Sequence, residues 1–173
     1  ALLLDVGATV QCTSEDLVTF AAMGAAYASK ISSIERPRVA LLSNGTASSG
    51  APPRVRDAHR RLLQSPSGFE YVGCLRADHV TSGDADVIVT DGFTGDVLLR
   101  TLEGVAATGE LLIKRAAEKF QWRLGVQMLG DGIAAIREFT DWENYGGASL
   151  LGVDRAVIVT QANSGRRAFL NAI

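Results

Sequence analysis

The sequence predicts an α/β protein built on a mainly parallel sheet. Short apolar runs typical of buried strands alternate along the chain with longer segments that have helical periodicity. Hydrophobic residues make up 47% of the composition, which is enough for a substantial core, and charged residues, at 21%, are too few for a disordered chain. A length of 173 residues fits one compact α/β domain over residues 1–173.

In the first half of the chain, strand and helix signals follow one another closely. An apolar run predicts the first strand at residues 2–6, and Ser14 is expected to cap a helix whose apolar side chains mostly share one face. Pro37 breaks that helix. Further strands are expected at 38–42, 69–73 and 85–90, with a basic helix at 54–63.

In the second half, a long helical region is expected at 97–120, a strand at 155–160 and a closing helix capped by Ser164. Residues 111–139 mix large apolar side chains with lysine and arginine, and glycines within them predict two shorter helices. A basic amphipathic segment of this kind is typical of a peripheral membrane contact or of a partner helix. A plain helix with a core face is the alternative.

Charge and cysteine content exclude several classes of protein. A net charge of −2 and few aromatic residues give no reason to expect a nucleic-acid partner. Cys12 and Cys74 have no metal-ligand spacing and suggest no disulfide framework, so a reducing, cytoplasmic location without a bound metal is expected. No apolar run approaches the roughly 20 residues that a membrane span needs. The chain starts directly as a core strand without Met, which suggests the middle of a longer protein.

The segment 91–97, DGFTGDV, carries the clearest chemical signal. It follows an apolar strand and precedes a helical pattern, so a glycine turn would place free backbone N–H groups at the positive end of a helix. That arrangement favours an anion, above all phosphate. An ordinary strand-to-helix turn is the alternative. Because ligands of parallel α/β folds gather beyond the carboxyl ends of strands, the loops at 43–53, 91–96 and 161–164 are the candidate site.

Several phrases together resemble one family, the PlsX-type phosphate acyltransferases. The matching phrases are LDVGA at 4–8, LVTFAAMG at 17–24, PRVALLSNG at 37–45, DGFTGDVLLRTLEG at 91–104 and YGGASLLG at 145–152. They occur in the family's order over almost the whole chain. They correspond to about the C-terminal half of the family's usual length.

The resemblance implies an enzyme that moves an acyl group from acyl carrier protein to inorganic phosphate, giving acyl phosphate for phospholipid synthesis. It also implies a three-layer α/β/α fold like that of isocitrate and isopropylmalate dehydrogenases, a homodimer, and a reaction without metal or organic cofactor. On this basis the protein is cytoplasmic or peripheral at the membrane, with 111–139 as the contact. We expect catalytic roles for Asp91, Thr94 and Asn163, and substrate or phosphate binding by Asn44, Gly45, Gly92, Phe93, Gly95, Asp96 and Ser164.

Three of the loops that should carry the chemistry depart from the family pattern. The stretch 44–54 lacks the family's acidic residues and its lysine, for which Arg54 or Arg56 could substitute. Asp96 stands where the family has asparagine, which would place a carboxylate near a phosphate dianion. Residues 160–165 replace a Gly-His-Gly phrase, so a histidine is missing. These departures leave two alternatives open beside the family's reaction: acyl transfer with a changed substrate, and a non-catalytic or partner-dependent subunit.

Overall fold

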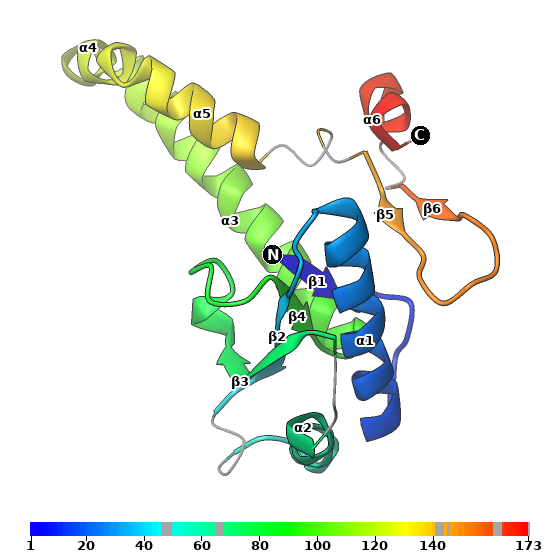
Figure 1. Cartoon of the computed structure of the whole chain (residues 1–173). Helices are drawn as coiled ribbons and strands as arrows, with labels where there is room; N and C mark the ends of the chain where they lie inside the picture. Colours follow the sequence, from blue (N-terminus) through cyan, green and yellow to red (C-terminus); the bar gives the residue numbers. More distant parts are fainter. Residues whose placement is uncertain (46–49, 65–67, 141–143, 145, 161–163, 173) are drawn as a thin grey trace. The chain divides into compact units, whose positions relative to one another are not determined.

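The computed structural model describes the whole chain except residues 46–49, 65–67, 141–143, 145, 161–163 and 173. The chain divides into two compact units, Ala1–Leu99 and Arg100–Ile173. Figure 1 shows the elements of both units in chain order. The expectation of one domain over residues 1–173 stays a prediction.

The first unit contains a four-stranded sheet in which every described pairing is parallel. Its strands are β1 (Leu2–Leu4), β2 (Arg38–Ser43), β3 (Glu70–Arg76) and β4 (Val87–Val89), in the spatial order β1-β4-β2-β3. Ile88 of the central strand β4 lies opposite Leu3 on one side and Ala40 on the other. The order confirms the predicted α/β class, because parallel neighbours require crossovers and the helices supply them.

The two faces of this sheet are buried separately. Side chains at alternate positions, Val39, Leu41, Val87 and Val89, pack with helices α1 (Ser14–Ile31) and α2 (Pro53–Gln64). The intervening positions, Ala40, Leu42 and Ile88, pack on the opposite face with Leu98 of α3 (Gly92–Glu118). Helices on both faces of a parallel sheet are the three layers of an α/β/α fold, as predicted.

Helix α1 begins one residue away from the predicted cap. The hydroxyl of Thr13 accepts the N–H of Asp16 at 3.2 Å, and the Asp16 carboxylate accepts the N–H of Thr13 at 2.8 Å. This reciprocal capping box makes Thr13 the cap and Ser14 the first helical residue. Residues 13–16 are Thr-Ser-Glu-Asp, and the hydroxyl that caps the helix is the one three residues before Asp16.

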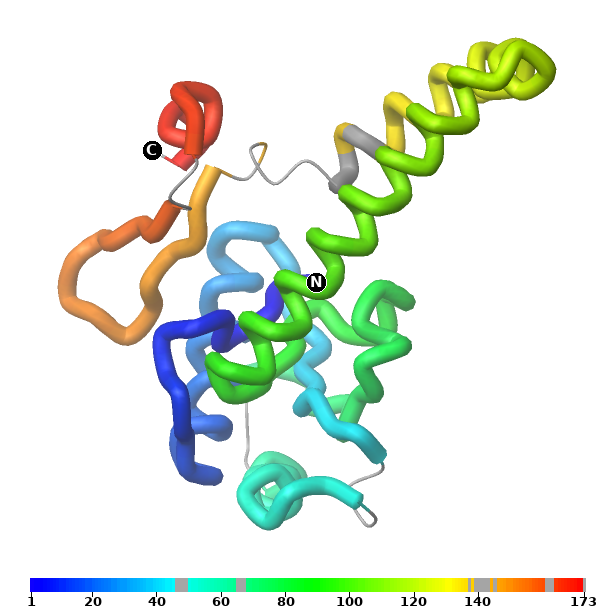
Figure 2. Tube along the Cα trace, turned by 180° about the vertical axis from the view of Figure 1, so that it is seen from behind, coloured from blue at the N-terminus to red at the C-terminus, as the bar shows by residue number. Residues whose placement is uncertain are grey.

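The long helix differs more from its prediction. Helix α3 begins at Gly92, five residues before the expected start, and ends at Glu118. Two shorter helices follow, α4 (Phe120–Met128) and α5 (Gly130–Thr140), which agrees with the predicted interruption of the segment 111–139. Figure 2 shows α3 from behind as one continuous helix in green. None of the helices in the described part of the chain is both long and apolar enough to cross a membrane.

The end of the chain departs from the parallel pattern. The expected strand at 155–160 is only β6 (Ile158–Val159), which pairs antiparallel with β5 (Ala148–Ser149) in a separate two-stranded sheet. The last helix, α6 (Arg166–Ala172), starts with a hydrogen bond from Phe169 N–H to Gly165 O. Ser164 does not cap it, because the buried Ser164 hydroxyl has no hydrogen-bond partner among the described residues.

Candidate functional site

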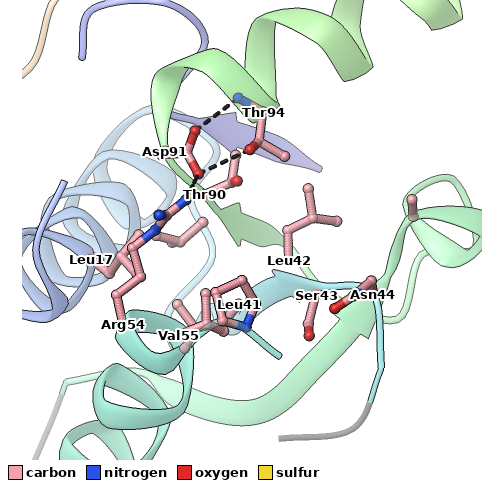
Figure 3. Close-up of a pocket in the computed structure, with 13 residues that line it drawn as sticks. Leu17, Leu41, Leu42, Ser43, Asn44, Arg54, Val55, Thr90, Asp91 and Thr94 are labelled. Atoms are coloured by element: carbon pink, nitrogen blue, oxygen red, sulfur yellow. Dashed lines mark hydrogen bonds and ion pairs between the residues drawn. The ribbon is translucent and has the colours of Figure 1, made fainter. Parts of the chain in front are cut away.

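A pocket of about 260 Å³ lies in the first unit, at the carboxyl ends of β2 and β4 (Figure 3). The ends of these two parallel neighbours meet at one edge of the sheet, so the pocket occupies the place that the strand order predicts. Its polar lining residues are Ser43, Asn44, Arg54, Thr90, Asp91 and Thr94. Its apolar lining residues are Leu17, Leu41, Leu42, Pro52, Val55, Ala77 and Val89.

Asp91 is the centre of the hydrogen bonding in this pocket. Asp91 is 6% exposed, and its Oδ1 accepts the Thr94 N–H at 2.9 Å. Its Oδ2 accepts the Thr94 hydroxyl at 2.9 Å and the Arg54 Nη2 at 2.8 Å. Figure 3 shows these three interactions converging from α2 and from the start of α3. The carboxylate therefore ties together two elements that are distant in the sequence.

The contacts of Asp91 keep its carboxyl group ionised. Burial by itself raises the pKa of Asp91, but the hydrogen bonds from the Thr94 N–H and hydroxyl and from Arg54 outweigh it, so the pKa lies below its ordinary value. The Arg54 guanidinium, whose side chain is 42% exposed, balances the charge at the pocket wall. Asp91 thus holds a fixed arginine at the edge of the pocket.

The start of α3 offers fewer free amides than the sequence suggests. Asp91 takes the position of the N-terminal cap, since its carboxylate accepts the Thr94 N–H. The Gly95 N–H donates to Asp91 O at 2.9 Å. The interpretation of 92–95 as a turn with free N–H groups is therefore wrong for Thr94 and Gly95. Gly92 and Phe93 are the first two residues of the helix, and neither of them lines the pocket.

The two glycines at the start of α3 are needed for a close approach to the loop that follows β1. A Cβ on Gly92 would overlap the Thr9 backbone and lie 2.8 Å from Asp5 Oδ2, and one on Gly95 would overlap the Asp5 carbonyl. Asp5 is itself buried and accepts the N–H groups of Ala8 and Thr9 at 2.9 and 2.7 Å. Asp5 therefore shapes the loop against which α3 begins.

The structure brings some of the expected site residues together and leaves others apart. Asn44, Asp91 and Thr94 line the pocket. Gly45 follows directly and donates its N–H to the Ser43 hydroxyl at 3.3 Å. Phe93 is largely exposed. Asp96 lies on the first turns of α3 near Gly7 and does not line the pocket. Ser164 belongs to the second unit, and Asn163 is outside the described residues.

Three polar residues of the pocket were not among the site residues expected from the sequence. Ser43 and Thr90 lie at the carboxyl ends of β2 and β4, a position that the strand rule alone could have marked. Of the two arginines considered as substitute cations, Arg54 lines the pocket and Arg56 does not. The pairing of Arg54 with Asp91 spans 37 residues, and no local pattern indicates it.

Comparison with known proteins agrees with the resemblance. The chain is 43% identical over 173 residues to the phosphate acyltransferase of Campylobacter lari, with 99% of this chain and 52% of that protein covered. It is 40% identical over 175 residues to the phosphate acyltransferase of Myxococcus xanthus, with 99% and 49% covered. For the enzyme of that name from Nitratiruptor, the identity is 37% over 174 residues, with 100% and 52% covered. The chain thus spans about half the length of the curated relatives it matches.

The family-level match is complete for this chain. The family model described as "Fatty acid synthesis protein" matches residues 1–173. This match, the parallel α/β/α fold and the motifs around the pocket all agree, and the chain belongs to the fatty acid synthesis protein family.

Proposed function

We propose that the protein containing this chain transfers an acyl group from acyl-acyl carrier protein to inorganic phosphate, and so supplies acyl phosphate for phospholipid synthesis. Family membership and the names of the curated relatives support an acyltransferase of this kind. The observation that carries the proposal is the pocket where Arg54, Asn44 and the start of α3 meet. It offers hydrogen-bond donors of the kind that bind a phosphate anion.

The proposed reaction is a direct displacement at a thioester. A phosphate oxygen attacks the thioester carbonyl, the tetrahedral intermediate collapses, and the carbon–sulfur bond breaks. The carrier leaves as a thiolate, which takes up a proton, and the acyl group stays on phosphate. Thioester and phosphate contain all the atoms required, so the proposal includes no metal or organic cofactor. The protein contributes by holding phosphate beside the carbonyl and by stabilising the developing oxyanion.

The contacts in the pocket separate the roles of the expected residues. The Thr94 proton is directed to Asp91, so Thr94 and Asp91 position the start of α3 and do not themselves donate to the substrate. Gly92 and Phe93, at the first turn of α3, remain proposed backbone donors to the substrate. Asn44 lines the pocket after β2, and it and the neighbouring Gly45 remain proposed phosphate contacts. Asn163 and Ser164 remain proposed contacts to phosphate or acyl phosphate.

A peripheral membrane contact through 111–139 is part of the proposal. Phe120 is 84% exposed and Met128 80% exposed on α4, and Lys119 precedes that helix. No residue of α4 is buried in the described part of the chain, which suits a surface contact. Exposed apolar side chains beside basic ones suit an anionic membrane surface, where the product would enter phospholipid synthesis. A homodimer is proposed on the resemblance alone.

The function is tested by mixing the purified protein with acyl-acyl carrier protein and phosphate and measuring the free carrier thiol, with arsenate in parallel. The expected result is thiol release that depends on phosphate and saturates with it, and that arsenate also supports. Asp91→Ala should reduce this release strongly, because it leaves Thr94 and Arg54 without their common acceptor. A folded protein that neither binds phosphate nor releases thiol would instead favour the alternative, a non-catalytic or partner-dependent subunit.

A further inference from the structure

Arg54 is the one positively charged side chain among the described residues that line the pocket. It projects from the first turn of α2, and its Nη2 donates to Asp91 Oδ2 at 2.8 Å. A guanidinium group has five N–H donors arranged in a fork, and this contact uses one nitrogen of the three. The side chain is 42% exposed, so the rest of the group is accessible from the solvent.

We propose that Arg54 binds the inorganic phosphate, and that Asp91 holds the guanidinium in place for it. This inference rests on the function proposed above and names the residue that supplies the positive charge. A guanidinium fork matches two phosphate oxygens at once, and a charge-assisted pair of this kind is among the strongest polar contacts in proteins. Asn44 lies in the lining of the same pocket and adds an amide donor from the end of β2.

The charge balance of the pocket supports this assignment. Without Arg54, the ionised Asp91 would face the pocket alone, and a carboxylate repels a phosphate dianion. With Arg54 in place, Asp91 is already hydrogen-bonded by three donors, two of them from Thr94. The three donors therefore compensate the charge of the carboxylate, and the arginine has further donors for an anion.

The arrangement also explains how Asp91 contributes without touching phosphate. A free arginine on a helix surface loses rotamer entropy when it binds a ligand. The contact with Asp91 removes part of that freedom before the ligand arrives, because one end of the fork is already fixed. Asp91 is in this scheme a positioning residue, and Arg54 is the residue in contact with the substrate.

The test measures phosphate binding by calorimetry, with inorganic phosphate alone, for the wild type and for Arg54→Ala, Arg54→Lys and Arg56→Ala. Arg56 is the matched control, since it is an exposed arginine on the same helix that does not line the pocket. Steady-state KM values for phosphate and for the acyl donor are measured in parallel. Unfolding midpoints establish that each variant is folded.

Arg54→Ala is expected to weaken phosphate binding about ten- to hundredfold, the usual loss for a charge-assisted contact. Arg54→Lys should recover part of the affinity, because it keeps the charge but not the fork. The KM for the acyl donor should stay unchanged, and Arg56→Ala should bind phosphate like the wild type.

Two failures are distinguishable. If the wild type shows neither saturable phosphate binding nor phosphate-dependent thiol release, the proposed function itself fails and the inference falls with it. If the wild type binds phosphate and Arg54→Ala binds it as tightly as Arg56→Ala does, the inference alone is overturned. A rise in the KM of the acyl donor without a change for phosphate would also overturn it, since Arg54 would then contact the carrier.

Discussion

Replacing Gly95 by alanine tests whether the start of α3 is fixed by its close approach to the loop after β1. A methyl group on Gly95 would overlap the carbonyl oxygen of Asp5, and it would lie 2.9 Å from the Asp5 carbonyl carbon and 3.1 Å from Thr90 Cγ2. The first two of these atoms belong to the backbone, so a side-chain rotation cannot relieve the overlap. Either α3 or the loop has to move.

The expected magnitude follows from two opposing effects. Alanine in place of glycine inside a helix stabilises the folded state by about 1 kcal/mol. Overpacking costs about 1–3 kcal/mol, and a clash with backbone belongs at the upper end of that range. The net expectation for Gly95→Ala is therefore a loss of about 2 kcal/mol in the free energy of unfolding.

Gly104→Ala is the matched control in the same helix. A Cβ at Gly104 meets nothing within 4 Å, so only the helix propensity changes and a gain of about 1 kcal/mol is expected. The two variants should differ by about 3 kcal/mol in urea titrations at equal m-value. Gly95→Ala should also weaken phosphate binding, whereas Gly104→Ala should not. If Gly95→Ala were as stable as Gly104→Ala, the close approach of α3 to Asp5 would be refuted.

Three further changes probe single interactions. The lowered pKa of Asp91 means that its contribution to stability is present above about pH 4 and is lost as the pH falls through the folded-state value. Asp91→Asn should lower the free energy of unfolding by about 2 kcal/mol at neutral pH and by less in acid. A loss of stability that does not depend on pH in urea titrations would contradict this. Thr13→Ala should cost about 1 kcal/mol by loss of the capping box, whereas Thr13→Ser should leave the unfolding midpoint unchanged. Burial, with a smaller effect of Cys74, raises the pKa of Tyr71 above its ordinary 10.0, so stability should fall as the pH rises beyond that value. In a spectrophotometric pH titration, Tyr71→Phe should remove the tyrosine that ionises at the highest pH. Loss of a tyrosine that ionises at lower pH would contradict the raised pKa of Tyr71.

The fold of the first unit was largely predictable because its strands are short, continuous and apolar. Most residues of 38–42 and 85–90 are apolar, which is typical of strands covered by helices on both faces. Because the carboxyl ends of parallel strands lie at the same edge of the sheet, the strand prediction also gives the position of the site. Asn44, Asp91 and Thr94 line the pocket for that reason.

The start of α3 and the closing strand could not be read from local patterns. Glycine at 92 and 95 lowers helix propensity, so a turn was the natural prediction for that stretch. The helix forms there because Asp91 caps it and because it packs closely against Asp5, which lies far away in the sequence. The apolar stretch 155–160 has a strand pattern, but only two of its residues pair, in an antiparallel ladder.

The pocket also bears on the choice between an active and a degenerate enzyme. The sequence departs from the family by placing a carboxylate at 96 and by lacking a lysine in the stretch 44–54, and both changes should weaken phosphate binding. Asp96 does not line the pocket, so its charge acts from a greater distance than the sequence suggested. Arg54 lines the pocket from α2 and supplies a cation where the family's lysine is missing. Two of the three departures therefore remove less of the phosphate site than the sequence alone suggests, and this supports the catalytic proposal.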